Sequence, residues 1–283
     1  MTRKACQSRA PLCESSNEPT SKRTNMVLLL SCLQHHSRTM QSTLLVTLLI
    51  GFVSLLYSTA GQVGGTAFLA VMAFAGLSAE QMRPTALVLN VVAASYATWK
   101  LHRHRKIDWN LLWQIAIPSM LTAFIGGLLS IGGSLYSIMT GTLLIAASFL
   151  MLLKRRVDNI KHRQVPLDLA ALVGAATGLL SGLTGIGGGV FLVPLILMLG
   201  WVSPRQAAGL SPPFILCNSV LALAGVLLSG QSVNPEIAFY IFGAVLGAML
   251  GTCIGLRWMT DWATRYVLAT ILLFAGVRLL LSR

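Results

Sequence analysis

The sequence predicts an all-α, polytopic integral membrane protein with about eight transmembrane helices, two half-helices and an internal duplication of two halves. Three observations support this fold class. Of 283 residues, 55% are hydrophobic and only 10% are charged, against roughly 25% charged residues in soluble domains. A mean hydropathy of +0.74 excludes a disordered chain. The charged residues fall between long apolar runs, and one glycine-rich pattern occurs twice.

Eight apolar segments approach the length of about 20 residues that a helix needs to cross the bilayer. They are Thr43 to Ala60, Pro84 to Trp99, Leu111 to Ser130, Leu135 to Leu153, Leu167 to Leu183, Ala207 to Leu228, Ile237 to Leu256 and Ala263 to Leu281. Two shorter segments, Thr66 to Gly76 and Val190 to Gly200, cover roughly half of the hydrocarbon core at about 1.5 Å per residue. We expect these two segments to be half-helices.

The chain divides into a tail, two repeats and a linker. Residues 1–40 form a basic tail that we expect to be disordered, or to precede a true start of translation at Met40. Residues 41–153 form the first membrane repeat, 154–166 a basic cytoplasmic linker, and 167–283 the second membrane repeat. The duplication rests on Leu55 to Gly65, which aligns without gaps on Leu179 to Gly189. In each copy a half-helix, a turn with an arginine and a longer helix follow.

The glycine-rich breaks are the candidate site. Glycine is a poor helix former, and hydrocarbon does not tolerate the uncovered backbone N–H groups of a break unless protein or a water-filled cavity surrounds them. We expect each break to line a water-filled site, with close packing of helices as the alternative. The helix that restarts after a break presents unpaired amides and a partial positive charge, which attract anions. We therefore predict a small anionic substrate, with binding residues Gly61, Gly64, Gly65, Thr66, Asn90, Thr184, Gly185, Gly187, Gly188, Gly189, Ser211 and Asn218.

The distribution of charge supports an anion and argues against other functions. The apolar segments contain almost no carboxylates, which mark cation and proton pathways, whereas Arg83 and Arg205 follow the two half-helices as further anion ligands. The histidines lie in the tail and basic loops, and the cysteines lack metal-ligand spacing. We therefore predict no enzyme, no metal and no cofactor. The basic loops fit the positive-inside rule, so we predict no nucleic-acid partner.

Two predictions concern the arrangement of the helices in the bilayer. With re-entrant half-helices, eight crossings place the tail, both basic loops and the C-terminus inside, which we prefer. If each half-helix instead completes a crossing, five segments in each half give inverted repeats with the tail outside. Four glycines at every fourth position form one small-residue stripe, which we interpret as a packing face and as a candidate surface for a homo-oligomer. They are Gly243, Gly247, Gly251 and Gly255.

The run from Gly178 to Leu195 resembles the signature of the TauE/SafE sulfite exporter family, in which a glycine cluster is followed by Pro-Leu. Ala207 to Ser211 is similar to a second segment of that family. The first half departs from the signature, because Gln62 to Gly65 has one glycine fewer and Ala70 stands where Pro194 stands in the second copy. The resemblance implies a bacterial inner-membrane permease for sulfite, sulfonates or related sulfur-containing anions. A membrane scaffold or partner subunit without transport of its own is the alternative function.

Overall fold

The computed structural model describes residues 43–59, 61–129, most of 138–149, 165–258 and scattered positions between 266 and 281, and all regular structure in them is α-helical. The longer elements are a helix at Thr43–Thr59, α3 (Gly65–Phe74), α4 (Ala79–Arg103), α5 (Trp109–Leu128), α7 (Leu167–Thr184), α8 (Gly189–Met198), α9 (Pro204–Leu228) and α10 (Ile237–Trp258). Among them α5, α7, α9 and α10 contain stretches long and apolar enough to span a membrane. The all-α membrane fold class is confirmed.

Both half-helices are present, and each has 10 residues. The longer helix after each of them is extended beyond its predicted apolar segment, since α4 and α9 each have 25 residues. Arg83 and Arg205 therefore lie within the first turns of these helices and not in the turns before them. The predicted tail and residues 154–164 of the predicted linker lie outside the described residues, and the segments predicted at Leu135 to Leu153 and Ala263 to Leu281 are described only in part.

Local sequence sets where the long helices begin. Asp108 precedes α5, and its carboxylate accepts hydrogen bonds from the backbone amides of Asn110 and Leu111. Ser203 and Gln206 form a reciprocal capping box at the start of α9, where Pro204 occupies the first helical position. Such caps satisfy amides that have no partner inside a helix.

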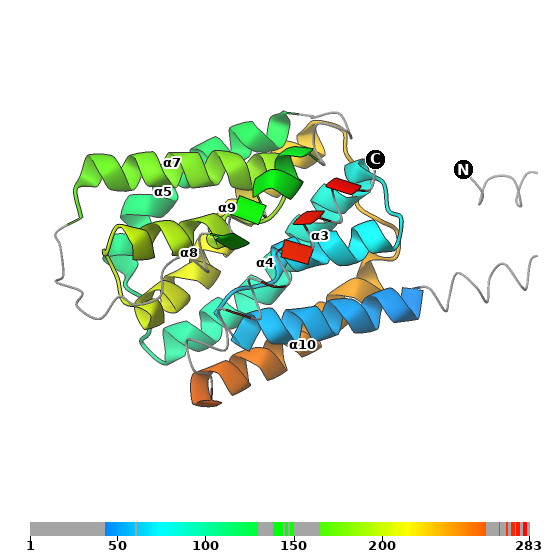
Figure 1. Ribbon diagram of the computed structural model, residues 1–283, viewed down its shortest axis with the longest axis horizontal. Helices are drawn as coiled ribbons and strands as arrows, with labels where there is room; N and C mark the ends of the chain where they lie inside the picture. Colours follow the sequence, from blue (N-terminus) through cyan, green and yellow to red (C-terminus); the bar gives the residue numbers. More distant parts are fainter. Residues whose placement is uncertain are drawn as a thin grey trace, which may run out of the picture. The chain divides into compact units, whose positions relative to one another are not determined.

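The glycine stripe of α10 is buried against the Thr43–Thr59 helix, as Figure 1 shows for the two ribbons. A Cβ atom built on Gly243 would lie 2.5 Å from the carbonyl oxygen of Thr47. Cβ atoms built on the other three stripe glycines would also collide with backbone carbonyls. Gly247 faces the carbonyl of Gly51, Gly251 that of Leu55, and Gly255 that of Thr59. The packing role predicted for the glycine stripe is thus confirmed. A helix of the same chain covers these glycines, and the homo-oligomer stays a prediction.

A second pair of helices repeats this contact between the two halves of the chain. Three glycines of α7 lie directly against backbone carbonyls of α5. Gly174 faces the carbonyl of Ile115, Gly178 that of Ser119, and Gly182 that of Ala123. Residue numbers rise together in both pairs of helices, so each pair is parallel. In both cases the first helix of one half packs against a helix of the other half. These contacts lie within one compact unit, Leu45–Arg283.

The helix directions differ from those that re-entrant half-helices predict. α9 runs parallel to α5, because Ser119 contacts Asn218 and Gly127 contacts Gly225. α7 is also parallel to α5, so α7 and α9 run in the same direction although only α8 lies between them. α4 runs the other way, because Lys106 after its end lies against Gly209 near the start of α9. α10 and the Thr43–Thr59 helix run with α4, because Thr85 contacts Asn234 and Lys100 contacts Cys253. Each half-helix therefore lies between two long helices that run in the same direction, and the two halves begin in opposite directions. These directions agree with the ten-segment alternative, and the number of crossings stays a prediction.

We expect Gly247→Leu to destabilise the protein without changing its oligomeric state. The new side chain would meet the carbonyl of Gly51 and push the Thr43–Thr59 helix away from α10. Overpacking of this kind costs about 1–3 kcal/mol. Thermal unfolding and size-exclusion chromatography with light scattering, both in detergent, would check this result. Met249→Leu on the exposed face of α10 is the control; an unchanged melting temperature with a smaller oligomer would show that the stripe joins subunits.

Candidate functional site

The two half-helices begin at the glycine breaks. Gly64 precedes α3 with a φ of 96°, and Gly188 precedes α8 with a φ of 76°. This left-handed conformation strains any residue with a Cβ atom, which explains the glycines. Neither half-helix has a side-chain hydrogen bond at its cap. The first amides of α3 and α8 are therefore not occupied by a capping side chain, and each start presents the positive end of a helix dipole.

The two breaks meet at Asn90 of α4. Its side-chain Nδ2 donates a hydrogen bond to the carbonyl oxygen of Ile186 at 3.2 Å. A Cβ atom on Gly65 would collide with the same carbonyl and would lie 2.7 Å from Asn90 Nδ2. A Cβ atom on Gly187 would lie 3.0 Å from that nitrogen. The start of α3 and the break before α8 are thus brought into direct contact.

Three buried polar side chains around this junction each have an atom without a hydrogen-bond partner. They are Asn90, Ser211 and Ser219, which we call the central polar cluster; all three are 0% exposed, and the free atoms are Asn90 Oδ1, Ser211 Oγ and Ser219 Oγ. A Cβ atom on Gly189 would lie 2.8 Å from Ser211 Oγ, and one on Gly187 would lie 3.0 Å from Ser219 Oγ. Buried polar atoms are nearly always paired in proteins. The cluster therefore indicates a place for water or a polar ligand.

Similar free atoms lie close by. Gln62 Oε1 lies in the first break, and Ser181 Oγ and Asn218 Nδ2 lie in α7 and α9. Ile215 fills the space between Ser211 and Ser219 along one face of α9, and its side chain faces Gly187 and Gly189. The junction lies beside the middle of α9, which is deep in the helical layer and far from the helix ends.

The polar groups of the junction are distributed unequally between the halves. α4 and α9 have the same length, so their positions can be compared one by one. Ser211 and Ser219 of α9 correspond to Ala86 and Ala94 of α4, whereas Asn90 of α4 corresponds to Ile215 of α9. The second half thus supplies two hydroxyls and the first half supplies one amide.

Arg83 is not available as an anion ligand, which corrects the role expected for it. Arg83 is 1% exposed, and its guanidinium donates hydrogen bonds to the carbonyls of Gly182 (3.0 Å) and Leu129 (2.9 Å) and to that of Gly126. Two of these carbonyls belong to the last turns of α5 and α7, and Leu129 directly follows α5. Arg83 therefore caps the ends of two helices. It lies beside Gly185, where an added Cβ atom would be 2.9 Å from Arg83 Cγ.

The structure brings five of the predicted site residues to the junction and places the others around it. The five are Gly65, Asn90, Gly187, Gly189 and Ser211. Gly61 and Gly185 let the breaks approach α9 and α4 closely, at Ala208 and Arg83 respectively. Gly64 lies against Tyr57 and Phe68, and Gly188 lies against Phe214 and Ser181.

The remaining three predicted residues already have partners. Thr66 Oγ1 donates to the hydroxyl of Tyr57 at 3.0 Å, and Thr184 Oγ1 donates to the carbonyl of Leu180 at 2.6 Å. Asn218 Oδ1 accepts a hydrogen bond from Ser119 at 2.9 Å. Sequence reasoning missed Ser219, Ser181 and Gln62. The eight-residue spacing of Ser211 and Ser219 places both on one helix face and was the available signal for Ser219.

The breaks are buried and not open to water, contrary to the expectation of a wet break. Residues 62–65 and 185–189 are all buried, and side chains of α4 and α9 cover them. The cavity of about 450 Å³ described below has apolar walls and is lined by α5 and α9. The junction is thus occluded in this conformation, although it keeps the unpartnered atoms of the central polar cluster.

Comparison with known proteins identifies the family. The model of the family described as "Sulfite exporter TauE/SafE" matches residues 43–279. The chain is 30% identical over 232 residues to a probable membrane transporter protein of Sinorhizobium fredii, which covers 81% of this chain and 94% of the relative. A probable membrane transporter protein of Haemophilus influenzae is 27% identical and covers 71% of this chain and 78% of the relative. No solved structure is significantly similar to the chain. The match over nearly the whole membrane part shows that this multi-pass membrane protein belongs to the sulfite exporter TauE/SafE family.

Proposed function

We propose that the protein is a permease for a small sulfur-containing anion, such as sulfite or a sulfonate, which binds at the central polar cluster. The family and the names of its relatives indicate a membrane transporter rather than an enzyme. The observation that carries the site is the group of unpartnered buried atoms between the starts of two half-helices. Polar atoms buried in a fully packed junction are usually paired.

The chemistry of the junction favours an oxyanion. The serine hydroxyls donate hydrogen bonds, and the starts of α3 and α8 add backbone donors and positive dipole ends. The free Oδ1 of Asn90 is instead an acceptor. A singly protonated oxyanion, such as hydrogen sulfite, offers acceptor oxygens to the hydroxyls and a proton to the amide oxygen. We propose this protonation state as the bound form.

The arrangement of the halves supports alternating access. Paired half-helices that meet near the centre of the helical layer, contributed by oppositely directed halves, are a recurring design in secondary transporters. The buried junction corresponds to an occluded state in that cycle. Movement of α3 and α4 against α8 and α9 would open the junction to one side and then to the other.

We further propose that the protein lies in a bacterial inner membrane with its basic loops in the cytoplasm. The residues from His102 to Lys106 are all exposed at the end of α4, and Gly209 near the start of α9 packs against Lys106. Positive charge at this end of the helices fits the positive-inside rule.

We expect Ser219→Ala to weaken transport while leaving the protein as stable as before or more stable. The mutation removes a buried hydroxyl that has no partner, so folding loses nothing, whereas a bound anion loses a hydrogen bond. The loss of one hydrogen bond to a charged group corresponds to a rise in KM of about 10- to 100-fold. Uptake of radiolabelled anion into proteoliposomes and thermal unfolding would provide the two measurements.

Ser119→Ala is the matched control, because Ser119 Oγ already donates to Asn218. Its loss leaves a buried acceptor unpaired and should lower stability with a smaller effect on KM. A Ser219→Ala protein that is less stable but has an unchanged KM would contradict the proposed site. The same assay with sulfite, sulfate, thiosulfate and methanesulfonate, with and without a pH gradient, tests the substrate class. A failure of wild-type protein to move any of them would favour the scaffold alternative.

A further inference from the structure

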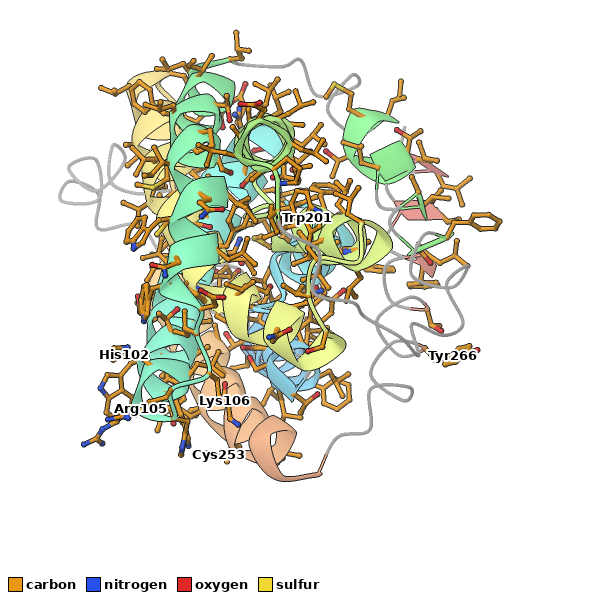
Figure 2. All side chains as sticks on the ribbon, turned by 90° about the vertical axis from the view of Figure 1, so that its left-hand side faces the viewer. His102, Arg105, Lys106, Trp201, Cys253 and Tyr266 are labelled. Carbon is orange, nitrogen blue, oxygen red and sulfur yellow. The ribbon has the colours of Figure 1, made fainter. Side chains whose placement is uncertain are left out.

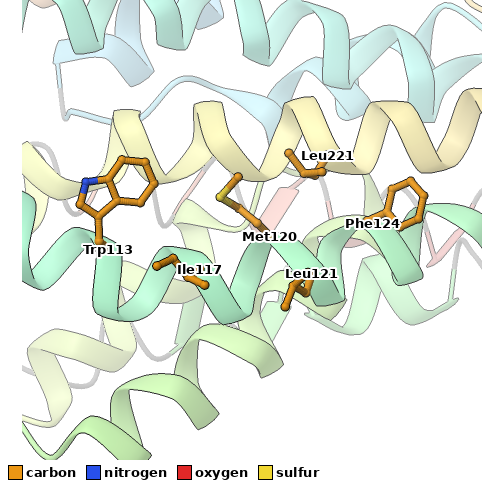
Figure 3. Close-up of a pocket in the computed structure, with 6 residues that line it drawn as sticks. All are labelled: Trp113, Ile117, Met120, Leu121, Phe124 and Leu221. Carbon is orange, nitrogen blue, oxygen red and sulfur yellow. The ribbon is translucent and has the colours of Figure 1, made fainter.

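An apolar groove runs along the outer face of α5 beside α9. It has a volume of about 450 Å³ and is lined by Trp113, Ile117, Met120, Leu121, Phe124 and Leu221, as Figure 3 shows. Ile117 is 57% exposed and Leu121 is 66% exposed, so the groove opens to the surroundings of the protein. In a membrane protein those surroundings are lipid chains. Along α5 the groove extends for roughly 16 Å, about the depth of one leaflet.

A row of aromatic rings joins the groove to the end of α4. Trp113 stacks on Trp109 with ring centroids 6.4 Å apart, and Trp109 meets the ring of His102 at 5.6 Å. Tryptophan is typical of the interface between hydrocarbon and headgroups. The row therefore places the headgroup level at Trp109 and His102, and the chain region at Trp113 and beyond.

The headgroup level carries concentrated positive charge. The basic turn, which we define as His102 to Lys106, is exposed throughout, and Figure 2 shows His102, Arg105 and Lys106 at the same end of the molecule. The only nearby acid in this described segment, Asp108, is engaged in capping α5. Arg103 lies over the ring of Trp99 at 5.1 Å, and Arg105 and Lys106 are exposed.

The backbone at Arg105 adds an independent observation. Arg105 has a φ of 51° and is the non-glycine residue with positive φ in the described part of the chain. The turn closes through a hydrogen bond from the Lys106 amide to the Leu101 carbonyl at 3.1 Å. Glycine is the usual residue at such a helix end, and a side chain there costs about 1–2 kcal/mol. An exposed arginine therefore occupies a position at which glycine is the usual residue.

We propose that this face binds one anionic phospholipid of the leaflet that contacts the basic turn. The acyl chain occupies the groove of α5 and α9, the glycerol backbone lies at Trp109, and the phosphate interacts with Arg105 and Lys106. This site is separate from the central polar cluster, and the proposal is independent of the transported substrate. Anionic rather than zwitterionic lipid is expected, because each basic residue near the headgroups strengthens binding of anionic lipid.

Native mass spectrometry of the purified full-length protein with added lipid tests this proposal. We expect one phosphatidylglycerol to remain bound under conditions that remove phosphatidylcholine with the same chains. The double variant Arg105→Gly and Lys106→Gln should weaken phosphatidylglycerol binding by about 30-fold, with an unchanged or higher melting temperature because the turn is relieved of strain. Ile117→Trp fills the groove and should also displace the lipid.

Matched variants separate this site from general attraction. Arg155→Gln with Arg156→Gln makes the same kind of charge change in the linker, and Leu172→Trp adds the same bulk at a position of α7 that is 66% exposed. Both should retain the lipid. Equal retention of the two lipids, or equal loss in the linker variant, would overturn the proposal. Glycerol 3-phosphate has the headgroup chemistry without acyl chains. If it displaced the bound phosphatidylglycerol, the proposal that an acyl chain occupies the groove would be overturned.

Discussion

Arg83→Gln is expected to lower the stability of the protein by about 3–5 kcal/mol. The buried guanidinium donates to the carbonyls of Gly126, Gly182 and Leu129, and a glutamine is too short to reach all of them. Carbonyls at helix ends that are buried without a donor are costly, and more so in a membrane. The melting temperature in detergent should fall by roughly 10 °C.

Two further variants define what this result means. Arg103→Gln removes the same charge from the exposed end of the same helix and should leave the melting temperature nearly unchanged. Arg83→Lys keeps the charge but lacks the planar donor geometry, so we expect an intermediate loss. If Arg83→Gln were as stable as the wild type yet unable to transport, Arg83 would be an anion ligand, and its structural role would be wrong.

Gly65→Ala is expected to abolish transport and to reduce stability by about 1–3 kcal/mol. The added methyl group would collide with the carbonyl of Ile186 and lie 2.7 Å from Asn90 Nδ2, so the start of α3 and the second break cannot keep their contact. A backbone carbonyl cannot rotate away as a flexible side chain can. Because the central polar cluster is assembled by this contact, its geometry would be lost. Proteoliposome uptake and thermal unfolding would measure both effects.

Gly51→Ala is the control for Gly65→Ala. Both glycines are helical and have ordinary backbone angles, but the nearest atom to a Cβ on Gly51 is the Gly243 carbonyl oxygen at 3.2 Å. We therefore expect a small loss of stability and nearly normal transport. Normal uptake by a folded Gly65→Ala protein would separate the junction from transport altogether.

The half-helices could be predicted because their cause is local. The glycines that adopt the left-handed conformation at Gly64 and Gly188 are adjacent in the sequence to short apolar segments, and both features are readable without knowledge of the fold. The candidate residues Asn90 and Ser211 were found in the same way, as polar residues in apolar helices that follow a break. Their binding role remains a prediction.

The helix directions and the partners of Arg83 could not be predicted in this way. Both depend on contacts between residues far apart in the chain, such as Arg83 with Gly182 or Gly247 with Gly51. Loop charges constrain on which side of the membrane a loop lies. They do not show whether a 10-residue helix returns to the side from which it entered or completes a crossing. Ser219 was missed because serine is common in membrane helices, and its isolation from partners is visible only when its neighbours are known.

The parallel contact between the Thr43–Thr59 helix and α10 has a consequence for biogenesis. The helix that enters the membrane first in the described chain acquires its glycine-lined neighbour only after almost all of the polypeptide has been synthesised. Until then its contact face must be held by lipid, the translocon or a chaperone. The two halves therefore assemble as one interlocked unit, and neither half produced alone has the surface that completes its first helix.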